Sequence, residues 1–241
     1  MPKVYGKPAL HAKNLYRVAS LRAIAAWSIA VLVMVSINEL GGIESFTKRG
    51  NSSFSITLLI IFAIIAVNIA RKAHVNAHKA KAGIDAENQV AKALRNVSAA
   101  AVIHGALLGK GGDADHIVLG PMAALIETKH GRGEVSVNAS QVFAGRKKLP
   151  KDPIGQANRQ AAALRKKIKG RYVQSILCVT QMSNSPFQHN GVIVCSIKDL
   201  PSVLRTVQNH DISAEEANKI AYTLISEPTP YRKPKNSKSV K

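Results

Sequence analysis

Residues 113–130 read DADHIVLGPMAALIETKH, and this stretch predicts a β-hairpin. Two apolar runs flank Gly120-Pro121, a dipeptide that marks turns. If the strands pair symmetrically about Pro121, residues whose numbers sum to 242 lie opposite each other, so Asp115 faces Glu127. Because side chains alternate between the two faces of a strand, Lys129 projects from the same face as Glu127. The hairpin therefore gathers two carboxylates and an ammonium at one end.

This grouping favours a site for a divalent metal ion. Two carboxylates so close together repel, which raises the pKa of one of them unless a cation lies between them. A hard ion such as Mg²⁺, or Mn²⁺ in its place, binds carboxylate oxygens, and we expect Asp115 and Glu127 to hold it. Such an ion stabilises charge on a phosphoryl group, and Lys129 could orient the attacking water or stabilise developing charge. In the alternative interpretation, Glu127 and Lys129 form an exposed pair at a strand edge.

The sequence around the hairpin predicts an α/β domain with a mixed central sheet flanked by helices. Ala- and Lys-rich residues 71–96 indicate helix, which we expect Gly83 to break. A second helix is expected at 154–169, crossing between the third and fourth strands. Short apolar runs separated by turn residues predict the strands, at 101–108, 116–119, 123–128, 172–180 and 192–197.

Two charge-free apolar runs precede this domain and predict a transmembrane helical hairpin. They lie at about residues 21–40 and 54–70, and a helix needs roughly 17 to 25 residues to cross a bilayer. Basic residues flank the outer ends of the pair, whereas charges in the intervening loop cancel. By the positive-inside rule both chain ends then lie in the cytoplasm. A pair of buried core helices is the alternative.

Composition points to a polyanionic partner. The chain has 34 Lys and Arg against 14 Asp and Glu, a net charge of +20. This balance favours nucleic acid or an anionic membrane surface. Two cysteines exclude a disulfide-rich scaffold and a four-thiolate zinc site. Aromatic residues make up only 5% of the chain, which disfavours a stacking platform for single strands.

Basic side chains cluster around the crossing helix and are candidate DNA contacts. Contacts of this kind bind phosphate rather than bases, so we expect salt-sensitive and largely non-specific binding. The same cations could instead hold the domain against anionic lipid. The predicted nucleic-acid-binding residues are Arg146, Lys147, Lys148, Arg159, Arg165, Lys166 and Lys169.

Several motifs in a fixed order carry a family resemblance. Asp115 is followed twelve residues later by Ile126-Glu127-Thr128-Lys129. A helix carrying Glu87 precedes the first strand, and Asp152-Pro153-Ile154-Gly155-Gln156 opens the crossing helix. Over about residues 83–195 this set resembles the PD-(D/E)xK nuclease superfamily and, more narrowly, its nuclease-related domain, NERD.

The resemblance implies a restriction-endonuclease-like core and metal-dependent cleavage of DNA. It assigns catalytic roles to Asp115, Glu127, Lys129, Glu87 and Gln156. Glu87 would assist through a second metal or an outer-shell contact, and Gln156 would steady the substrate or Lys129. Two positions depart from the family pattern, Ala86 in place of a frequent glycine and Asp152 in place of a common asparagine, and neither removes a metal ligand.

Together these expectations describe a nuclease-like protein anchored in a bacterial inner membrane and facing the cytoplasm. One alternative is a tethered DNA-binding protein that does not cleave, acting in plasmid transfer or maintenance. Another is a structural membrane protein whose basic face meets only lipid. The expected organisation is a basic cytoplasmic segment, a membrane hairpin, a basic helical linker, the nuclease-like domain and a basic disordered tail, at residues 1–20, 21–70, 71–82, 83–226 and 227–241.

Overall fold

A computed structural model describes residues 1–39, 52–109, 112–138, 141–207 and 212–226. The chain divides into two compact units. One is a helical unit, Leu10–Ile84. The other, called here the sheet unit, combines Met1–Ala9 with the described residues from Asp85 onward. Each unit is described by itself below.

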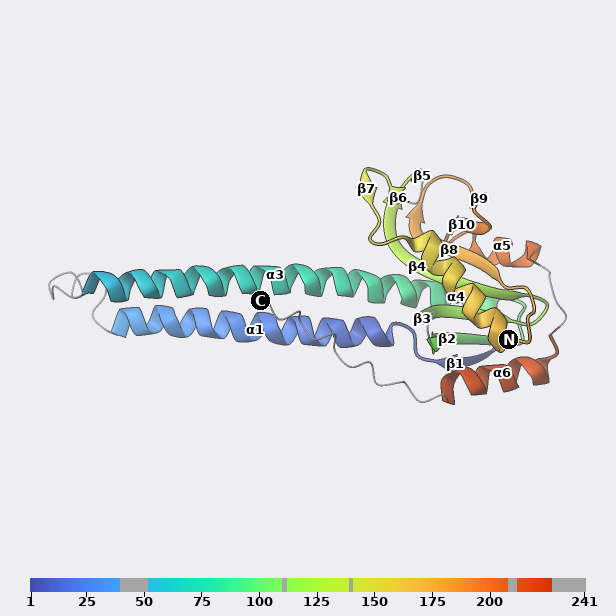
Figure 1. Cartoon of the computed structure of the whole chain (residues 1–241), viewed down its shortest axis with the longest axis horizontal. Helices are drawn as coiled ribbons and strands as arrows, with labels where there is room; N and C mark the ends of the chain where they lie inside the picture. The colour runs from blue at the N-terminus through green and yellow to red at the C-terminus, as the bar shows by residue number, and fades with distance from the viewer. Residues whose placement is uncertain (40–51, 110–111, 139–140, 208–211, 227–241) are drawn as a thin grey trace, which may run out of the picture. The chain divides into compact units, whose positions relative to one another are not determined.

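The sheet unit is built on a seven-stranded mixed sheet, in the order β1-β2-β3-β4-β8-β10-β9 (Figure 1). The β2–β3, β3–β4 and β9–β10 pairs are antiparallel, whereas β1–β2, β4–β8 and β8–β10 are parallel. The predicted mixed sheet is therefore confirmed. Its strands are β1 (Lys3–Gly6), β2 (Ala101–Leu107), β3 (Asp113–Leu119), β4 (Ala123–Gly133), β8 (Gln174–Met182), β9 (Phe187–His189) and β10 (Val192–Ser196).

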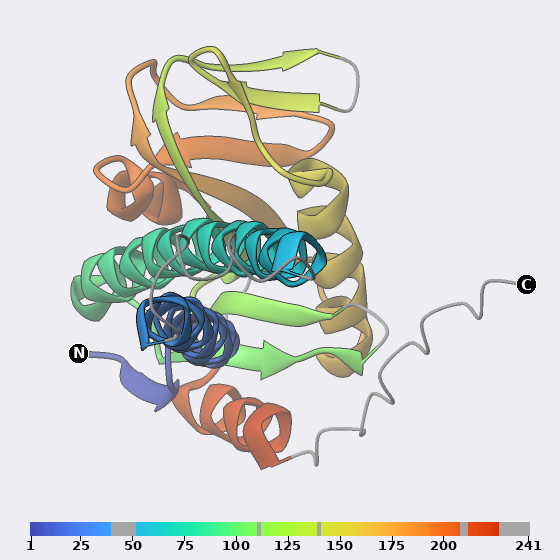
Figure 2. The same ribbon diagram turned by 90° about the vertical axis from the view of Figure 1, so that its left-hand side faces the viewer.

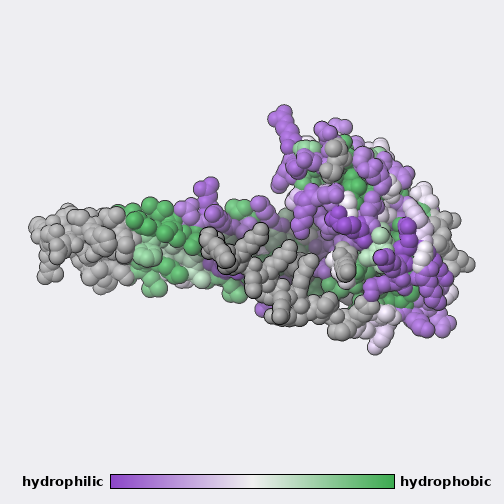
Figure 3. All heavy atoms as spheres, in the orientation of Figure 1, coloured by the Kyte–Doolittle hydropathy of each residue, from purple (hydrophilic) through white to green (hydrophobic). Residues whose placement is uncertain are grey.

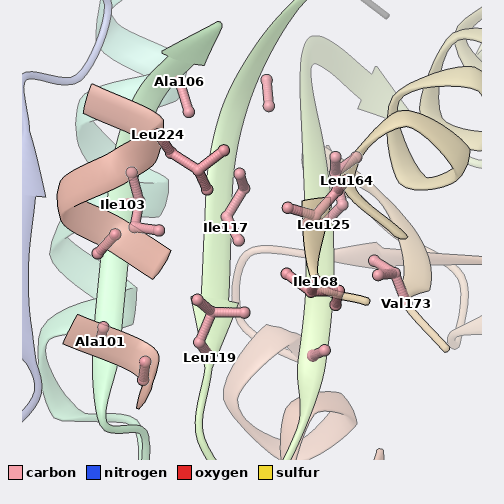
Figure 4. Packing of buried hydrophobic residues seen from close by; sticks show 14 of the residues in the cluster. Ala101, Ile103, Ala106, Ile117, Leu119, Leu125, Leu164, Ile168, Val173 and Leu224 are labelled. Carbon is pink, nitrogen blue, oxygen red and sulfur yellow. The ribbon is translucent and has the colours of Figure 1, made fainter. Parts of the chain in front are cut away.

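Helices cover both faces of this sheet. On one face, α4 (Pro153–Lys167) and α6 (Ala214–Ser226) pack on β2, β3 and β4. Figure 4 shows side chains of these helices, such as Leu164 and Leu224, meeting side chains of the strands. On the other face lie the end of α3 (Ser52–Ala93), η1 (Leu94–Asn96) and α5 (Leu200–Thr206).

The two cysteines belong to the core. Cys178 on β8 and Cys195 on β10 are register partners, and both are buried free thiols. They pack with the apolar side chains under α5 and the end of α3. Their role in the fold is that of small hydrophobic residues.

A small second sheet follows β4 and was not expected from the sequence. It contains β5 (Val135–Asn138), β6 (Gln141–Ala144) and β7 (Lys147–Lys148), in that order and antiparallel. Val135 and Val142 bury its inner side against Leu177 of β8. The strands are short and their outer positions are polar, which gives a weak alternation of apolar and polar residues.

Helix α4 begins and ends for identifiable reasons. The Asp152 side chain caps its first turn by accepting a hydrogen bond from the Gly155 N–H, at 2.9 Å. A Cβ on Gly155 would lie 1.9 Å from the Asp152 carboxylate, so the cap needs glycine there. The helix ends at Lys167 rather than at the predicted residue 169, and Lys169 takes a left-handed backbone with φ of 57°. Gly170 follows it, also with positive φ.

The helical unit contains α1 (Leu10–Glu39) and the first part of α3, which lie side by side in Figures 1 and 2. Buried alanines line both helices, with Ala26 and Ala30 on α1 and Ala66, Ala70, Ala73 and Ala77 on α3. Small residues at this spacing let two helices approach closely. Large apolar side chains on both helices are exposed, and much of the surface visible in Figure 3 along them is hydrophobic.

Within the part of the chain that the structure describes, two stretches are long and apolar enough to cross a membrane. They are Ala12–Val33 and Ile60–Asn96. The expected membrane hairpin therefore has two candidate spans, by length and composition only. The loop expected between the spans falls largely at residues 40–51, and the expected tail at 227–241; both lie outside the described residues.

Two expectations about local structure were wrong. Gly83 does not break the helix, because α3 runs continuously from Ser52 to Ala93. A single glycine costs a helix only about 1 kcal/mol, and the alanines and lysines around it favour helix. The first residues are not merely a basic segment, because β1 adds an edge strand to the main sheet and α1 begins at Leu10.

Candidate nuclease site

The hairpin has the register that the sequence predicts. His116 pairs with Ile126, Ile117 with Leu125, and so on to the turn, and each pair sums to 242. Pairing between β3 and β4 stops at His116, yet β3 continues along β2 to Asp113 and β4 continues along β8 beyond Lys129. The two strands therefore separate at the end that carries Asp115 and Glu127.

Asp115 fills part of the space where the strands separate. Its Oδ2 accepts a hydrogen bond from the backbone N–H of Thr128, at 2.7 Å. In an uninterrupted antiparallel ladder a strand N–H is satisfied by the neighbouring backbone carbonyl. Here a side-chain carboxylate takes that role, so Asp115 is held against the strand that carries Glu127.

Glu127 and Lys129 form an ion pair inside the domain. The Lys129 ammonium donates a hydrogen bond to Glu127 Oε1. The Glu127 side chain is only 1% exposed and that of Lys129 is 17% exposed, so this is not the exposed strand-edge pair of the alternative interpretation. Glu127 Oε2 is buried and has no hydrogen-bond partner among the described residues. A buried carboxylate oxygen without a partner is costly, and a cation or ordered water would satisfy it.

The electrostatics of the site centre on Asp115. Loss of hydration raises the pKa of the Asp115 carboxyl well above its ordinary value, and the negative charges of Glu127 and Glu87 raise it further. The Lys129 charge and the Thr128 N–H act in the opposite direction. The site therefore has an excess of negative potential, which a divalent cation would relieve.

Glu87 reaches this region from α3. Its charge acts on Asp115, and its Oε2 accepts a hydrogen bond from the backbone N–H of Ala9, at 2.7 Å. Among the described residues, no three His, Cys, Asp or Glu side chains are close enough to hold a metal ion together. Glu87 therefore lies near enough for its negative charge to raise the pKa of Asp115.

Gln156 lies half-buried in the first turns of α4, and no side-chain hydrogen bond in the described region joins it to Asp115, Glu127 or Lys129. One turn later, Gln160 is almost fully buried and its Nε2 donates to the carbonyl of Asp113, at 2.6 Å. Gln160 was not singled out from the sequence, although its i, i+4 spacing from Gln156 was a usable signal. It ties α4 to the start of the strand that carries Asp115.

A buried histidine pair lies on the strands next to the site. His104 and His116 are register partners, and their Nδ1 atoms are 2.7 Å apart. Burial lowers the pKa of His104 to about 4, helped by the Arg95 charge, and burial also lowers the pKa of His116. The sequence pattern did not reveal this pair, because single histidines within apolar strands give no local signal.

The predicted DNA contacts are all exposed, but they do not share one helical stripe. Arg146 lies in the turn before β7, and Lys147 and Lys148 form that strand. Arg159 and Lys166 are spaced i, i+7 on the outer side of α4. The Arg165 guanidinium stacks over the Tyr172 ring, 5.1 Å from its centroid. Lys169 lies beyond the end of the helix at Lys167, so it does not share a helical face with Arg165.

The residues present fit a divalent metal ion. Asp115 and Glu127 meet at one end of the hairpin, one buried oxygen of Glu127 lacks a partner, and the local charge is negative. Mg²⁺ usually takes one or two carboxylates and completes its shell with water or substrate oxygens. Two protein carboxylates would therefore be sufficient ligands.

The comparisons with known proteins agree with this geometry. The family model of the nuclease-related domain, NERD, matches residues 82–180. That match contains the helix with Glu87, the hairpin with Asp115, Glu127 and Lys129, and the helix with Gln156. No curated protein and no solved structure matches the chain significantly. Residues 82–180 are thus similar to the nuclease-related domain family.

Proposed function

We propose that the protein is a membrane-anchored, metal-dependent nuclease that hydrolyses phosphodiester bonds of DNA. The observation that carries this proposal is the meeting of Asp115, Glu127 and Lys129 where β3 and β4 separate, inside the nuclease-related domain. The Lys129 ammonium lies at the same place and can meet the negative charge of the reacting phosphate.

Asp115 and Glu127 are the residues that would hold the metal, Mg²⁺ or Mn²⁺. When bound, the ion would stabilise charge on the phosphate and lower the pKa of a coordinated water. The protein contributes a rigid frame for it, because the Thr128 N–H fixes Asp115 and the Lys129 ammonium fixes Glu127. Glu87 adds negative charge that strengthens attraction for a cation.

Hydrolysis adds one water across the phosphodiester bond. A new bond forms between the water oxygen and phosphorus, and the bond from phosphorus to the leaving ribose oxygen breaks. The attacking water loses a proton, and the leaving oxygen gains one. Lys129 has three N–H donors, one of which binds Glu127, so the others can donate to the attacking water or to a phosphate oxygen. In this proposal the ammonium is an orienting and charge-stabilising group.

Cations beyond the site would bind the DNA backbone. Arg146, Lys147 and Lys148 are consecutive and exposed at the small sheet. Arg159 and Lys166 add exposed charge along α4, the helix that also carries Gln156. Because such side chains contact phosphates, we expect little sequence preference.

The helical unit would anchor the enzyme in a bacterial inner membrane. No Asp or Glu occurs between Leu10 and Asn38 or between Ser52 and Ile84, whereas both stretches carry Lys and Arg. A groove between α1 and α3 is lined by apolar side chains together with Arg22, Asn76 and Lys79. Cations at the ends of apolar helices favour the cytoplasmic side, so both chain ends and the sheet unit would face the cytoplasm.

Alkaline extraction of membranes tests the anchoring, because an anchored chain stays in the pellet.

The decisive test uses the full chain in detergent or nanodiscs, because β1 precedes the helical unit and a fragment starting at residue 71 would lack this strand. Supercoiled plasmid is incubated with the protein and Mg²⁺, with or without a chelator. We expect metal-dependent nicking that Glu127→Ala abolishes.

The matched control is Glu134→Ala, which removes an exposed carboxylate seven residues further along the chain. This variant should nick DNA like the unmodified chain. Absence of metal-dependent nicking, or nicking that persists in Glu127→Ala, would reject the enzymatic proposal. If the chain retains plasmid without cutting it, the tethered DNA-binding alternative replaces hydrolysis.

A further inference from the structure

The first nine residues belong to the sheet unit and contribute a strand to its main sheet. Strand β1 pairs in parallel with β2, from Lys3 opposite Ala101 to Gly6 opposite His104. Tyr5 packs against the main core, and its hydroxyl donates to Asn218 Oδ1 on α6, at 2.8 Å. The strand is thus held by β2 on one side and by α6, which indicates a defined conformation rather than a loose terminus.

Two glycines fix the path of the chain after β1. Gly6 has φ of 74°, and a Cβ there would lie 2.1 Å from the carbonyl oxygen of His104. Gly105 has φ of 67°, and its Cβ would lie 3.1 Å from the carbonyl oxygen of Lys7. Neither position accepts another residue without displacement of the backbone. The backbone of the N-terminal segment therefore lies in close contact with the backbone of β2 at His104 and Gly105.

This segment ends at Ala9, whose backbone conformation is unusual for a residue other than glycine. Ala9 is buried, with 1% of its surface exposed, and its φ of 58° lies in the left-handed region. That conformation costs an alanine about 1 to 2 kcal/mol. It directs the Ala9 N–H to Glu87 Oε2, at 2.7 Å. Strain that persists beside a candidate site is a reason to look for a role there.

We propose that the backbone amide of Ala9 is a positioning group that holds the Glu87 carboxylate in place beside the nuclease site, so that residues 1–9 complete this site. The inference rests on the proposed function. Glu87 lies on α3 and Asp115 on β3, so their separation depends on how Glu87 is oriented. A hydrogen bond from an amide to a carboxylate is charge-assisted and short, and it restricts that orientation.

The proposal assigns a function to a segment outside the matched domain. The family match begins at residue 82, yet a partner of Glu87 comes from residue 9. Helix α1 begins at the next residue, Leu10, so the candidate anchor and the site are joined through Ala9 in the sequence. A nuclease domain cut out of this chain at its family boundaries would lack the amide.

The test compares full-length variants in detergent. Ala9→Pro removes the N–H and also shifts the local backbone, because proline cannot adopt a φ of 58°. Ala9→Gly keeps the N–H and relieves the left-handed strain. Binding of Mn²⁺, measured by titration calorimetry, should weaken in Ala9→Pro, because the negative charge of Glu87 is then no longer held in place near Asp115. The kcat for plasmid nicking should fall with little change in KM. Ala9→Gly should match the unmodified chain in both measurements.

A double variant separates positioning from general damage to the fold. If Ala9 acts through Glu87, then Ala9→Pro should have no further effect on Mn²⁺ affinity in a Glu87→Ala background. Full additivity of the two effects would overturn the inference, as would unchanged Mn²⁺ affinity in Ala9→Pro.

Hydrogen exchange tests the contact without altering the backbone. The Ala9 amide should exchange faster in Glu87→Ala, whereas Glu87→Gln should keep it slow because the amide oxygen still accepts. Equal exchange in both variants contradicts the proposal, even if Ala9→Pro fails to fold. If the unmodified chain binds Mn²⁺ in an Ala9-dependent way but does not nick DNA, the positioning role stands and the hydrolytic function fails.

Discussion

The carboxylate of Asp115 accepts a hydrogen bond from the backbone N–H of Thr128, across the point where β3 and β4 part. This contact lets a strand pair open without leaving the Thr128 N–H unsatisfied. Asp115 thus closes the end of the ladder, and in the function proposed above it would also supply a ligand oxygen to the metal. The two roles can be separated by substitution.

Asp115→Asn and Asp115→Ala should both lose nuclease activity but should differ in stability. The amide of Asn still offers an oxygen to the Thr128 N–H, whereas Ala leaves that donor without an acceptor, which costs about 1 to 3 kcal/mol. Removing the negative charge should reduce nicking to below about 1% in both. Activity comes from plasmid nicking, and stability from pulse proteolysis of the full chain across a urea series.

The comparison has an internal control, because the two variants change the same residue. Equal urea midpoints for Asp115→Asn and Asp115→Ala would show that the Thr128 contact contributes nothing to stability. Full nicking by Asp115→Asn would show that the charge of Asp115 is not needed.

Lys129→Met should destabilise the sheet unit more than the double variant Glu127→Gln/Lys129→Met does. The single change leaves the Glu127 carboxylate buried without its cation, and loss of one partner of a buried ion pair costs about 3 kcal/mol or more. The double variant replaces both charges by neutral groups of similar shape. The unmodified chain, Glu127→Gln, Lys129→Met and the double variant form a double-mutant cycle. Their stabilities, measured from urea unfolding, should be non-additive by more than about 1 kcal/mol.

Activity separates the chemical role of this pair from its role in folding. Both Lys129→Met and the double variant should fail to nick DNA, because each lacks the ammonium. Restored stability with restored activity in the double variant would mean that Lys129 acts only as a structural counter-ion.

The sequence was most informative about the hairpin. The turn at Gly120-Pro121 and two apolar runs determined the register as far as His116 and Ile126. Asp115 and Glu127 lie just beyond this paired part, close enough for the charge of Glu127 to act on Asp115. That inference worked because antiparallel pairing around a short turn is a local rule. The separation of the strands beyond His116 is not local, because there β3 pairs only with β2 and β4 pairs only with β8.

Features that depend on distant pairing could not be predicted in the same way. Strand β1 has four residues, and its partner β2 begins almost a hundred residues later. The continuity of α3 through Gly83 depends on its neighbours' helix propensity, which outweighs one glycine. The link from Ala9 to Glu87 joins a backbone amide to a side chain, and no residue type marks such a donor.

The buried His104 should make the sheet unit lose stability in mild acid. Its pKa is about 4 in the folded chain, lowered by burial and by Arg95, and about 6.5 when unfolded. The unfolded chain therefore binds more protons between these values, so stability falls as pH is lowered from about 6.5 to about 4 and is unaffected by His104 above that range. The difference amounts to at most about 3 kcal/mol.

Pulse proteolysis at pH 7.5 and pH 5 measures this loss. His104→Asn removes the titrating ring and should flatten the dependence, although His116 still faces the substituted position. His189→Asn, on the edge strand β9, serves as the control and should keep the slope of the unmodified chain. An unchanged slope in His104→Asn would mean that carboxylates, rather than this histidine, determine the acid response.

DNA affinity should depend on the run Arg146, Lys147 and Lys148 through charge alone. Replacing all three by Gln removes up to three phosphate contacts, so the slope of log affinity against log salt should fall by up to about 2.7. KM for plasmid nicking should rise while kcat stays nearly constant, because these residues are not among the proposed metal ligands Asp115 and Glu127. The control replaces three other exposed lysines, Lys92, Lys198 and Lys219, and loses the same charge. If both triple variants change the slope equally, net charge rather than a local DNA-binding surface determines the affinity.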